Sequence, residues 1–232
     1  MRYTPRFISL AAAACLSLIA GNALRADSVM VSENGVGANE TVWISSSNLG
    51  SDLHVYAGVL NLSVDGVATS GFCIDPWHWS SGSALSYNLE SLDNAPKSAN
   101  NTTPNPMGAS TALQIEQLWQ QYYTPGISNV NAAALQIKIW ELVDLAVDNG
   151  TFSLLSIDGG DSAAVTAAIN GMSTFLSQNP GAASANLVAV TGAGQDYVIP
   201  SVPDSGATVI LLGVALLGVG LAQTKFRLFP QA

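Results

Sequence analysis

The alternation of apolar and polar positions predicts a β-rich region from residue 41 onward. Residues 41–45 are β-branched and aromatic, and residues 53–64 form a long strand-like run. Asp65-Gly66 follows directly, and this pair favours a type I′ turn because both of its central positions need a positive φ. The turn returns the chain as an antiparallel strand over residues 67–72. A β-hairpin is therefore predicted over residues 53–72.

Cys73 is predicted to lie at the end of this returning strand. Pro76 comes three residues later and prevents the strand from continuing inside a sheet, because proline cannot donate a ladder hydrogen bond. Residues 80–110 are rich in Ser, Asn, Pro and Gly, so we expect a long surface loop there. A loop of this length in a compact domain is usually functional or disordered. Part of it is expected to fold over the region around Cys73.

Helical periodicity replaces the strand pattern from residue 110. The predicted helices cover residues 111–123, 132 to about 147, and 162 to about 178, with caps at Ser110, Asn131 and either Asp161 or Ser162. Short strands are predicted at residues 187–190 and 197–199. Strands, then helices, then strands argue for an α+β fold rather than alternating βαβ units. We expect an antiparallel sheet or barrel-like part with an inserted part of about three helices.

The middle predicted helix carries two adjacent apolar rows, so it is expected to be buried on more than one side. The rows are Leu135, Ile139, Leu142 and Ala146, and beside them Gln136, Trp140 and Val143. Gln136 therefore points inward, where a buried carboxamide needs a partner. Gln114 stands in a similar Ala-Leu-Gln-Ile run and is a rival. Only Gln136 is followed four residues later by a Trp, which can shield it from water, so Gln136 is preferred.

The charge balance narrows the range of partners. The net charge is −9, and residues 27–196 hold 15 Asp or Glu against only Lys97 and Lys138. Such a surface lacks the basic patch that meets phosphates, which argues against nucleic acid. It is also repelled by anionic lipid.

The first 26 residues have the pattern of a secretory signal peptide. Arg2 and Arg6 precede an almost unbroken apolar run, and small residues offer cleavage after Ala23 or Ala26. A retained anchor is disfavoured because the run is short for spanning a bilayer. Cys15 would leave with this peptide. Cys73 would then be the lone cysteine of an exported chain, either reactive or engaged in an intermolecular bridge.

The C-terminal end carries a second targeting pattern. The motif is Val202, Pro203, Asp204, Ser205 and Gly206, followed by an apolar run over residues 207–222 and by the basic residues Lys225 and Arg227. This arrangement resembles the VPDSG variant of PEP-CTERM sorting signals. The resemblance implies a transmembrane helix as a temporary inner-membrane anchor, cut by an exosortase-type enzyme, and a final location at the cell surface or in the extracellular matrix. The predicted domains are residues 1–26, 27–200 and 201–232.

Two short motifs suggest a specific chemistry, because a thiol held against a Gln carboxamide in a dry pocket can displace ammonia and close an internal thioester. The motifs are Phe72-Cys73-Ile74-Asp75 and Ala134-Leu135-Gln136-Ile137-Lys138-Ile139-Trp140-Glu141. Spacing alone favours a plainer interpretation, in which Cys73 is a buried small hydrophobe and Gln136 is an ordinary helical Gln that faces water. In their order, over residues 42–200, the motifs resemble the thioester domain of bacterial surface adhesins. The resemblance implies a Cys73–Gln136 cross-link that captures an amine on a partner surface.

Three interpretations follow from these patterns. The first is a single-turnover covalent binder, not an enzyme, that attaches to an amine-bearing surface protein or to a polysaccharide matrix. The second is a non-covalent extracellular-matrix protein with the same fold and a free Cys73. The third is a cysteine hydrolase or transferase in which His78 is the general base for Cys73. His54 is expected to be structural. Two His and one Cys make a poor metal set, and no cofactor motif is present, so neither metal nor cofactor is expected.

Overall fold

The computed structural model describes residues 28–46, 49, 51–97, 105–145, 151–159, 161–192 and 194–201. The chain divides into two units after Pro200, and every described helix and strand belongs to the first. No helix in the described ranges is long and apolar enough to cross a membrane. The predicted signal peptide, the VPDSG motif and the apolar run 207–222 lie outside these ranges, so the three predicted domains stay predictions.

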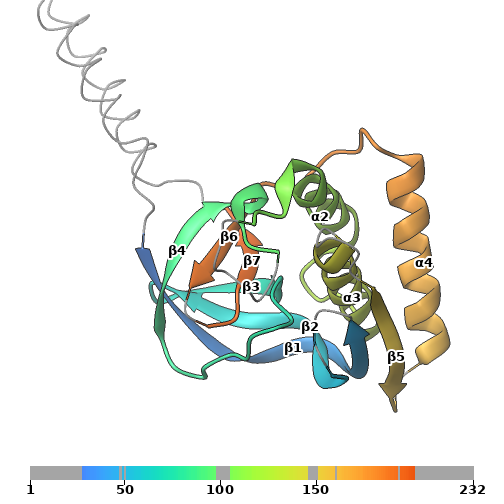
Figure 1. The fold of residues 1–232 in the computed structure, drawn as a ribbon, viewed down its shortest axis with the longest axis horizontal. Coiled ribbons are helices and arrows are strands. Elements are labelled where there is room, and N and C mark those ends of the chain that lie inside the picture. Colours follow the sequence, from blue (N-terminus) through green and yellow to red (C-terminus); the bar gives the residue numbers. More distant parts are fainter. Residues whose placement is uncertain are drawn as a thin grey trace, which may run out of the picture. The chain divides into compact units, whose positions relative to one another are not determined.

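The strands of the described residues close into an antiparallel barrel (Figure 1). They are β1 (Ser28–Ser46), β2 (Leu53–Val64), β3 (Val67–Cys73), β4 (Leu85–Ser91), β5 (Phe152–Asp158), β6 (Leu187–Gly192) and β7 (Tyr197–Pro200). The hydrogen-bonded order is β2-β3-β7-β6-β4-β1-β5, and β1 also pairs with β2. This extra pairing joins six strands into a ring, with β5 added along β1. The predicted α+β fold with a barrel-like antiparallel sheet is confirmed.

Strand β1 closes the barrel because it is long and irregular. It pairs with β2 from Val31↔Val64 to Ile44↔Leu53. Its other edge pairs with β4 near the start of the strand and with β5 near the end. The β1–β2 register shifts on either side of Val36, and such irregularities bend a strand and increase its twist. Closing a barrel requires this local bending.

The predicted hairpin is confirmed. Strand β2 has the predicted bounds, and Val64 pairs with Val67 across the turn. Asp65 has φ 49° and Gly66 has φ 81°, the positive values that a type I′ turn needs. The hairpin sets the register of β3, which ends at Cys73 as predicted.

Three strands depart from the sequence prediction. Strand β1 begins at Ser28, whereas the predicted strand begins at residue 41. The expected loop over residues 80–110 contains β4 and a short 3₁₀ helix, η1 (Leu92–Asn94), so that prediction was wrong for residues 85–94. Leu85, Tyr87 and Leu89 alternate with polar residues, which is the strand period hidden inside a polar composition. Strand β5 was not predicted, and its half-buried pattern is partly obscured by an exposed Leu155.

Three helices pack beside the barrel, as predicted (Figure 1). They are α2 (Gly108–Tyr122), α3 (Asn129–Leu145) and α4 (Ser162–Gln178). Asp161 caps α4 as predicted, accepting from the Ala164 N–H at 3.0 Å. The other two caps were wrong. Ser110 lies inside α2. Asn131 was the predicted cap of α3, but its own N–H donates to the hydroxyl oxygen of Ser128 at 3.3 Å, so Ser128 supplies the side-chain cap.

Helix α3 is the central helix of the structure. It contacts β1 and β2 on one side and α4 on the other (Figure 1). The fully buried side chains include Leu135 and Ile139 on one row and Gln136 and Val143 on the other. The predicted burial on more than one side is thus observed, and it turns Gln136 toward the barrel. A polar side chain placed there must find its partners inside the protein.

Candidate functional site

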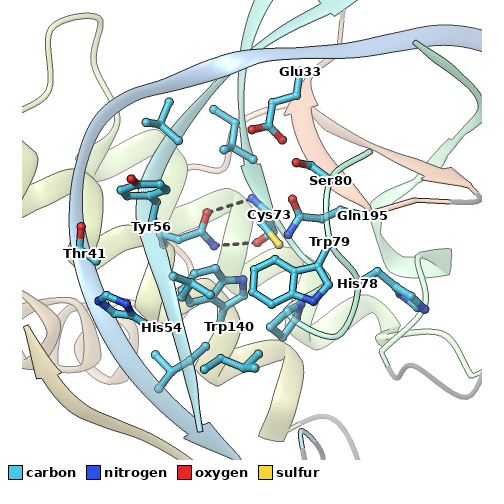
Figure 2. A pocket seen from close by; sticks show the side chains of 17 residues that line it. Glu33, Thr41, His54, Tyr56, Cys73, His78, Trp79, Ser80, Trp140 and Gln195 are labelled. Atoms are coloured by element: carbon cyan, nitrogen blue, oxygen red, sulfur yellow. Dashed lines mark hydrogen bonds between the residues drawn. The ribbon is translucent and has the colours of Figure 1, made fainter. Parts of the chain in front are cut away.

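The carboxamide of Gln136 is hydrogen-bonded to the backbone of Cys73 (Figure 2). The Cys73 N–H donates to Gln136 Oε1 at 2.9 Å, and Gln136 Nε2 donates to the Cys73 carbonyl oxygen at 2.7 Å. Only 3% of Cys73 and 1% of Gln136 is exposed. The structure therefore brings together two almost fully buried residues that lie 63 positions apart in the sequence.

The end of β3 explains why this place is available. Strand β2 pairs with β3 only as far as Leu60↔Gly71, whereas β7 continues to pair with Cys73 through Tyr197. The backbone groups of Cys73 that bond to Gln136 thus lie beyond the last pair that β2 makes. The Gln136 carboxamide makes the hydrogen bonds that these backbone groups need, in the place where a further residue of β2 would otherwise make them. This pairing by itself gives Gln136 a structural role.

A cavity of about 280 Å³ adjoins the pair. Cys73, Gln136, Trp140 and His78 are among its lining residues. Its lining also includes Tyr56 and Trp79, which are 61% and 68% exposed, so the cavity opens to the surface. A water molecule occupies about 30 Å³ in the liquid, so this space can admit a side chain from a partner. The rival Gln114 lies on α2 and does not line this cavity.

Trp140 lies one helical turn beyond Gln136 and is 3% exposed. Figure 2 shows its indole beside Cys73, with the ring nitrogen on the Cys73 side. This buried N–H has no hydrogen-bond partner among the described residues. It nevertheless lies close enough to lower the pKa of the Cys73 thiol. Trp140 thus lies next to Cys73 and lines the same cavity as Gln136, while its predicted role as a shield against water stays a prediction.

Asp75 organises the segment that follows Cys73. It is 5% exposed, and its carboxylate meets the Nδ1 of His78 at 2.6 Å and accepts the Trp77 N–H at 3.2 Å. The Asp75 N–H in turn donates to the Cys73 sulfur at 3.3 Å. The ring of His78 is directed away from Cys73 in Figure 2. His78 lines the cavity but is bonded to Asp75 rather than to the thiol.

These surroundings keep the thiol neutral at neutral pH. Burial raises the pKa of Cys73 far above its ordinary value, and the negative charge of Asp75 raises it further. The Trp140 N–H and the Asp75 N–H act in the opposite direction. Burial also raises the pKa of Asp75, against the effect of His78. The pKa of Asp196 rises to about 7, because of burial and then the charge of Asp75.

Some residues that line the cavity were not among the predicted site residues. Gln195 comes from the segment before β7, and Figure 2 shows it beside Cys73. Glu33 and Tyr56 come from the irregular β1–β2 pairing. Glu33 and Tyr56 stand in no recognisable motif, because only closure of the barrel brings them to Cys73. His54 contacts Asp158 at 2.6 Å and stacks on Trp43, and it also lines the cavity, so its predicted structural role stays a prediction.

Comparison with known proteins identifies the C-terminal signal. A VPDSG-CTERM motif matches residues 201–225. No curated protein matches the chain, and no solved structure does. The motif marks an exported protein that is associated with the membrane or the cell surface, and such signals are generally processed by an exosortase-like enzyme. The resemblance of residues 42–200 to thioester domains stays a prediction.

Proposed function

We propose that the domain over residues 27–200 forms an internal thioester between Cys73 and Gln136 and uses it once, to attach covalently to an amine on a partner surface. The observation that supports this most is the pair of hydrogen bonds that hold the Gln136 carboxamide against Cys73. They fix the acyl carbon beside the residue that carries the thiol. Because the fold already holds the two groups together, the reaction does not have to supply the entropy cost of bringing them together.

The proposed chemistry has two balanced steps. In the first, the Cys73 sulfur bonds to the Gln136 acyl carbon, the C–N bond breaks, and the thiol proton leaves with the amide nitrogen as ammonia. In the second, a primary amine attacks the same carbon, the C–S bond breaks, and the amine proton returns to the sulfur. The product is an amide between residue 136 and the partner, with a free Cys73.

The state of the thiol favours a single reaction over repeated turnover. A cysteine hydrolase needs a thiolate in every cycle, and its Cys–His pair supplies one. Here burial and Asp75 keep the thiol protonated, and His78 bonds to Asp75 instead of Cys73. A self-modification needs the thiolate only once during maturation and therefore tolerates a low thiolate fraction. We infer that the protein is not an enzyme.

The second candidate is a non-covalent matrix protein with a free Cys73. The observation in its favour is that the Gln136 hydrogen bonds already complete the backbone pairing of Cys73 without any covalent bond. The two functions differ in whether the acyl carbon of Gln136 reacts. In both, the partner lies outside the inner membrane, on a surface protein or in a polysaccharide matrix.

A labelled primary amine distinguishes the two candidates. A fluorescent alkylamine incubated with the domain 27–200 should become attached at residue 136, as located by peptide mass mapping, and should release one thiol per label. Cys73→Ala and Gln136→Ala should not be labelled. Gln114→Ala is the matched control, because it removes a carboxamide that does not line the cavity, and it should label normally. Absence of label from folded wild-type protein would favour the matrix candidate.

A further inference from the structure

We propose that the indole N–H of Trp140 is the hydrogen-bond donor that stabilises the Cys73 sulfur whenever it carries negative charge. This inference rests on the proposed function, in which that charge develops twice. The sulfur is a thiolate when it attacks Gln136, and again when the incoming amine displaces it. Trp140 thereby has a chemical role in addition to shielding the site from water.

The unpaired state of this N–H is the first argument. Trp140 is 97% buried, and its Nε1 has no hydrogen-bond partner among the described residues. A buried donor without a partner costs about 1–3 kcal/mol, so natural proteins rarely keep one without a reason. Formation of a charged sulfur beside it supplies the missing acceptor. The cost is thus present in the resting state and relieved in the reacting state, as catalysis by differential binding requires.

The position of the ring is the second argument. Trp140 follows Gln136 by four residues on α3, so both side chains leave the same face of the helix and line the same cavity as Cys73. Figure 2 places the indole nitrogen on the Cys73 side of the ring. The carboxamide and the donor are therefore held by one rigid helix, which keeps their relation to the sulfur constant during the reaction.

A second donor completes the arrangement. The Asp75 backbone N–H lies 3.3 Å from the Cys73 sulfur. Both donors lower the pKa of the thiol, against burial and the negative charges of Asp75 and Asp196, which raise it. Other titratable residues also face the thiol: Glu33, His54, Tyr56 and His78 line the same cavity, and Tyr197 pairs with Cys73 across β3 and β7. The indole contribution can be removed alone, because Trp140→Phe keeps an aromatic ring and loses the N–H.

The test compares Trp140→Phe with Trp77→Phe in the full chain. Trp77 also carries a buried indole N–H without a hydrogen-bond partner in the described part of the chain, but it does not line the cavity. The rate of methylamine capture by the thioester should fall about tenfold or more in Trp140→Phe, the effect of losing a hydrogen bond to a charged group. Trp77→Phe should react at the wild-type rate. Equal rates in all three proteins would overturn the proposal.

A second measurement does not depend on the thioester. In a Gln136→Ala background the thiol stays free whether or not the wild type closes the bond. The pH profile of iodoacetamide labelling, read on the Cys73 peptide, should move to higher pH when Trp140→Phe is added and should not move with Trp77→Phe. An unmoved profile refutes the role of Trp140. A wild type without any ammonia loss would refute the proposed function while leaving this comparison valid.

Discussion

At the scale of single residues, Gln136 has one observed role and one proposed role, and the two compete for the same atoms. As an intact amide it completes the backbone pairing of Cys73 through two buried hydrogen bonds. As an acyl donor it gives up the amide nitrogen, and with it the hydrogen bond to the Cys73 carbonyl oxygen. The covalent C–S bond then holds the two segments together instead. The hydrogen bonds between Gln136 and Cys73 would therefore position the two residues before the reaction, and the C–S bond would take their place afterwards.

The structural role of Gln136 can be measured without the covalent one. Cys73→Ala removes the thiol but keeps the backbone groups to which Gln136 bonds. Adding Gln136→Ala to that variant should lower the free energy of unfolding by about 2–4 kcal/mol, because two buried backbone groups lose their partners. Urea titration measures this difference. Gln114→Ala in the same background is the control and should change it by less than about 0.5 kcal/mol. Equal effects of the two substitutions would contradict the geometry.

Asp196 gives the domain a pH dependence of unusual sign. Its pKa is raised from 3.8 to about 7 by burial, then by Asp75, with the Gly192 N–H and His78 opposing and Glu90 adding to the increase. Between these pH values the folded state holds a proton that the unfolded chain has released. Stability therefore falls as the pH rises from about 4 to about 7, and is level above that.

Asp196→Asn should remove most of this decline. The variant keeps the oxygen that accepts the Gly192 N–H, and it cannot ionise. The free energy of unfolding should fall between pH 4.5 and pH 7.5 by about 3 kcal/mol less in the variant than in the wild type. A smaller decline remains because burial also raises the pKa of Asp75. Asp52→Asn, at an exposed position, is the control and should decline like the wild type. A variant that keeps the full decline would refute this assignment.

At the scale of elements, the sequence predicted those parts that local patterns determine. The β2–β3 hairpin follows from the Asp65-Gly66 turn, and α3 follows from its helical period. Two helix caps and β5 were missed, and β4 was taken for a loop, because its polar composition masked a period of two. The Cys73–Gln136 contact was anticipated through the resemblance. The position of Glu33 beside this site could not be anticipated, because it depends on the closure of the barrel.

The element that delivers Cys73 is itself closely packed. A Cβ at Gly71 would lie 2.9 Å from the Val198 carbonyl oxygen on β7 and 2.8 Å from Leu62. Since backbone on β7 cannot retreat easily, Gly71→Ala should push β3 outward, cost about 1–3 kcal/mol of stability and lower amine labelling at residue 136. Gly171→Ala is the control, because nothing lies within 4 Å and it sits inside α4.

The two alanine substitutions should change the stability of the domain in opposite directions. Gly171→Ala should stabilise the domain by about 0.5–1 kcal/mol, since alanine favours a helix over glycine, and should leave labelling unchanged. Thermal or urea unfolding measures both effects. Normal labelling and stability in Gly71→Ala would mean that the packing of β3 against β7 does not position Cys73.

At the scale of the whole molecule, the C-terminal signal and the site lead to one account. The VPDSG-CTERM motif marks an exported protein, and the barrel holds a hidden thiol and carboxamide beneath a cavity that opens to the surface. The domain is acidic, with 15 Asp or Glu against two Lys over residues 27–196. A partner with positively charged amines is therefore attracted, more strongly at low salt. A covalent bond would make this attachment permanent.

The most direct measurement of the account is the intact mass of the purified domain, residues 27–200, before any amine is added. The account predicts a mass lower than the sequence mass by one ammonia, with no titratable thiol at Cys73. The full mass should return in Cys73→Ala and Gln136→Ala, after allowance for each substitution. A folded wild-type domain with the full sequence mass and one free thiol would contradict the thioester.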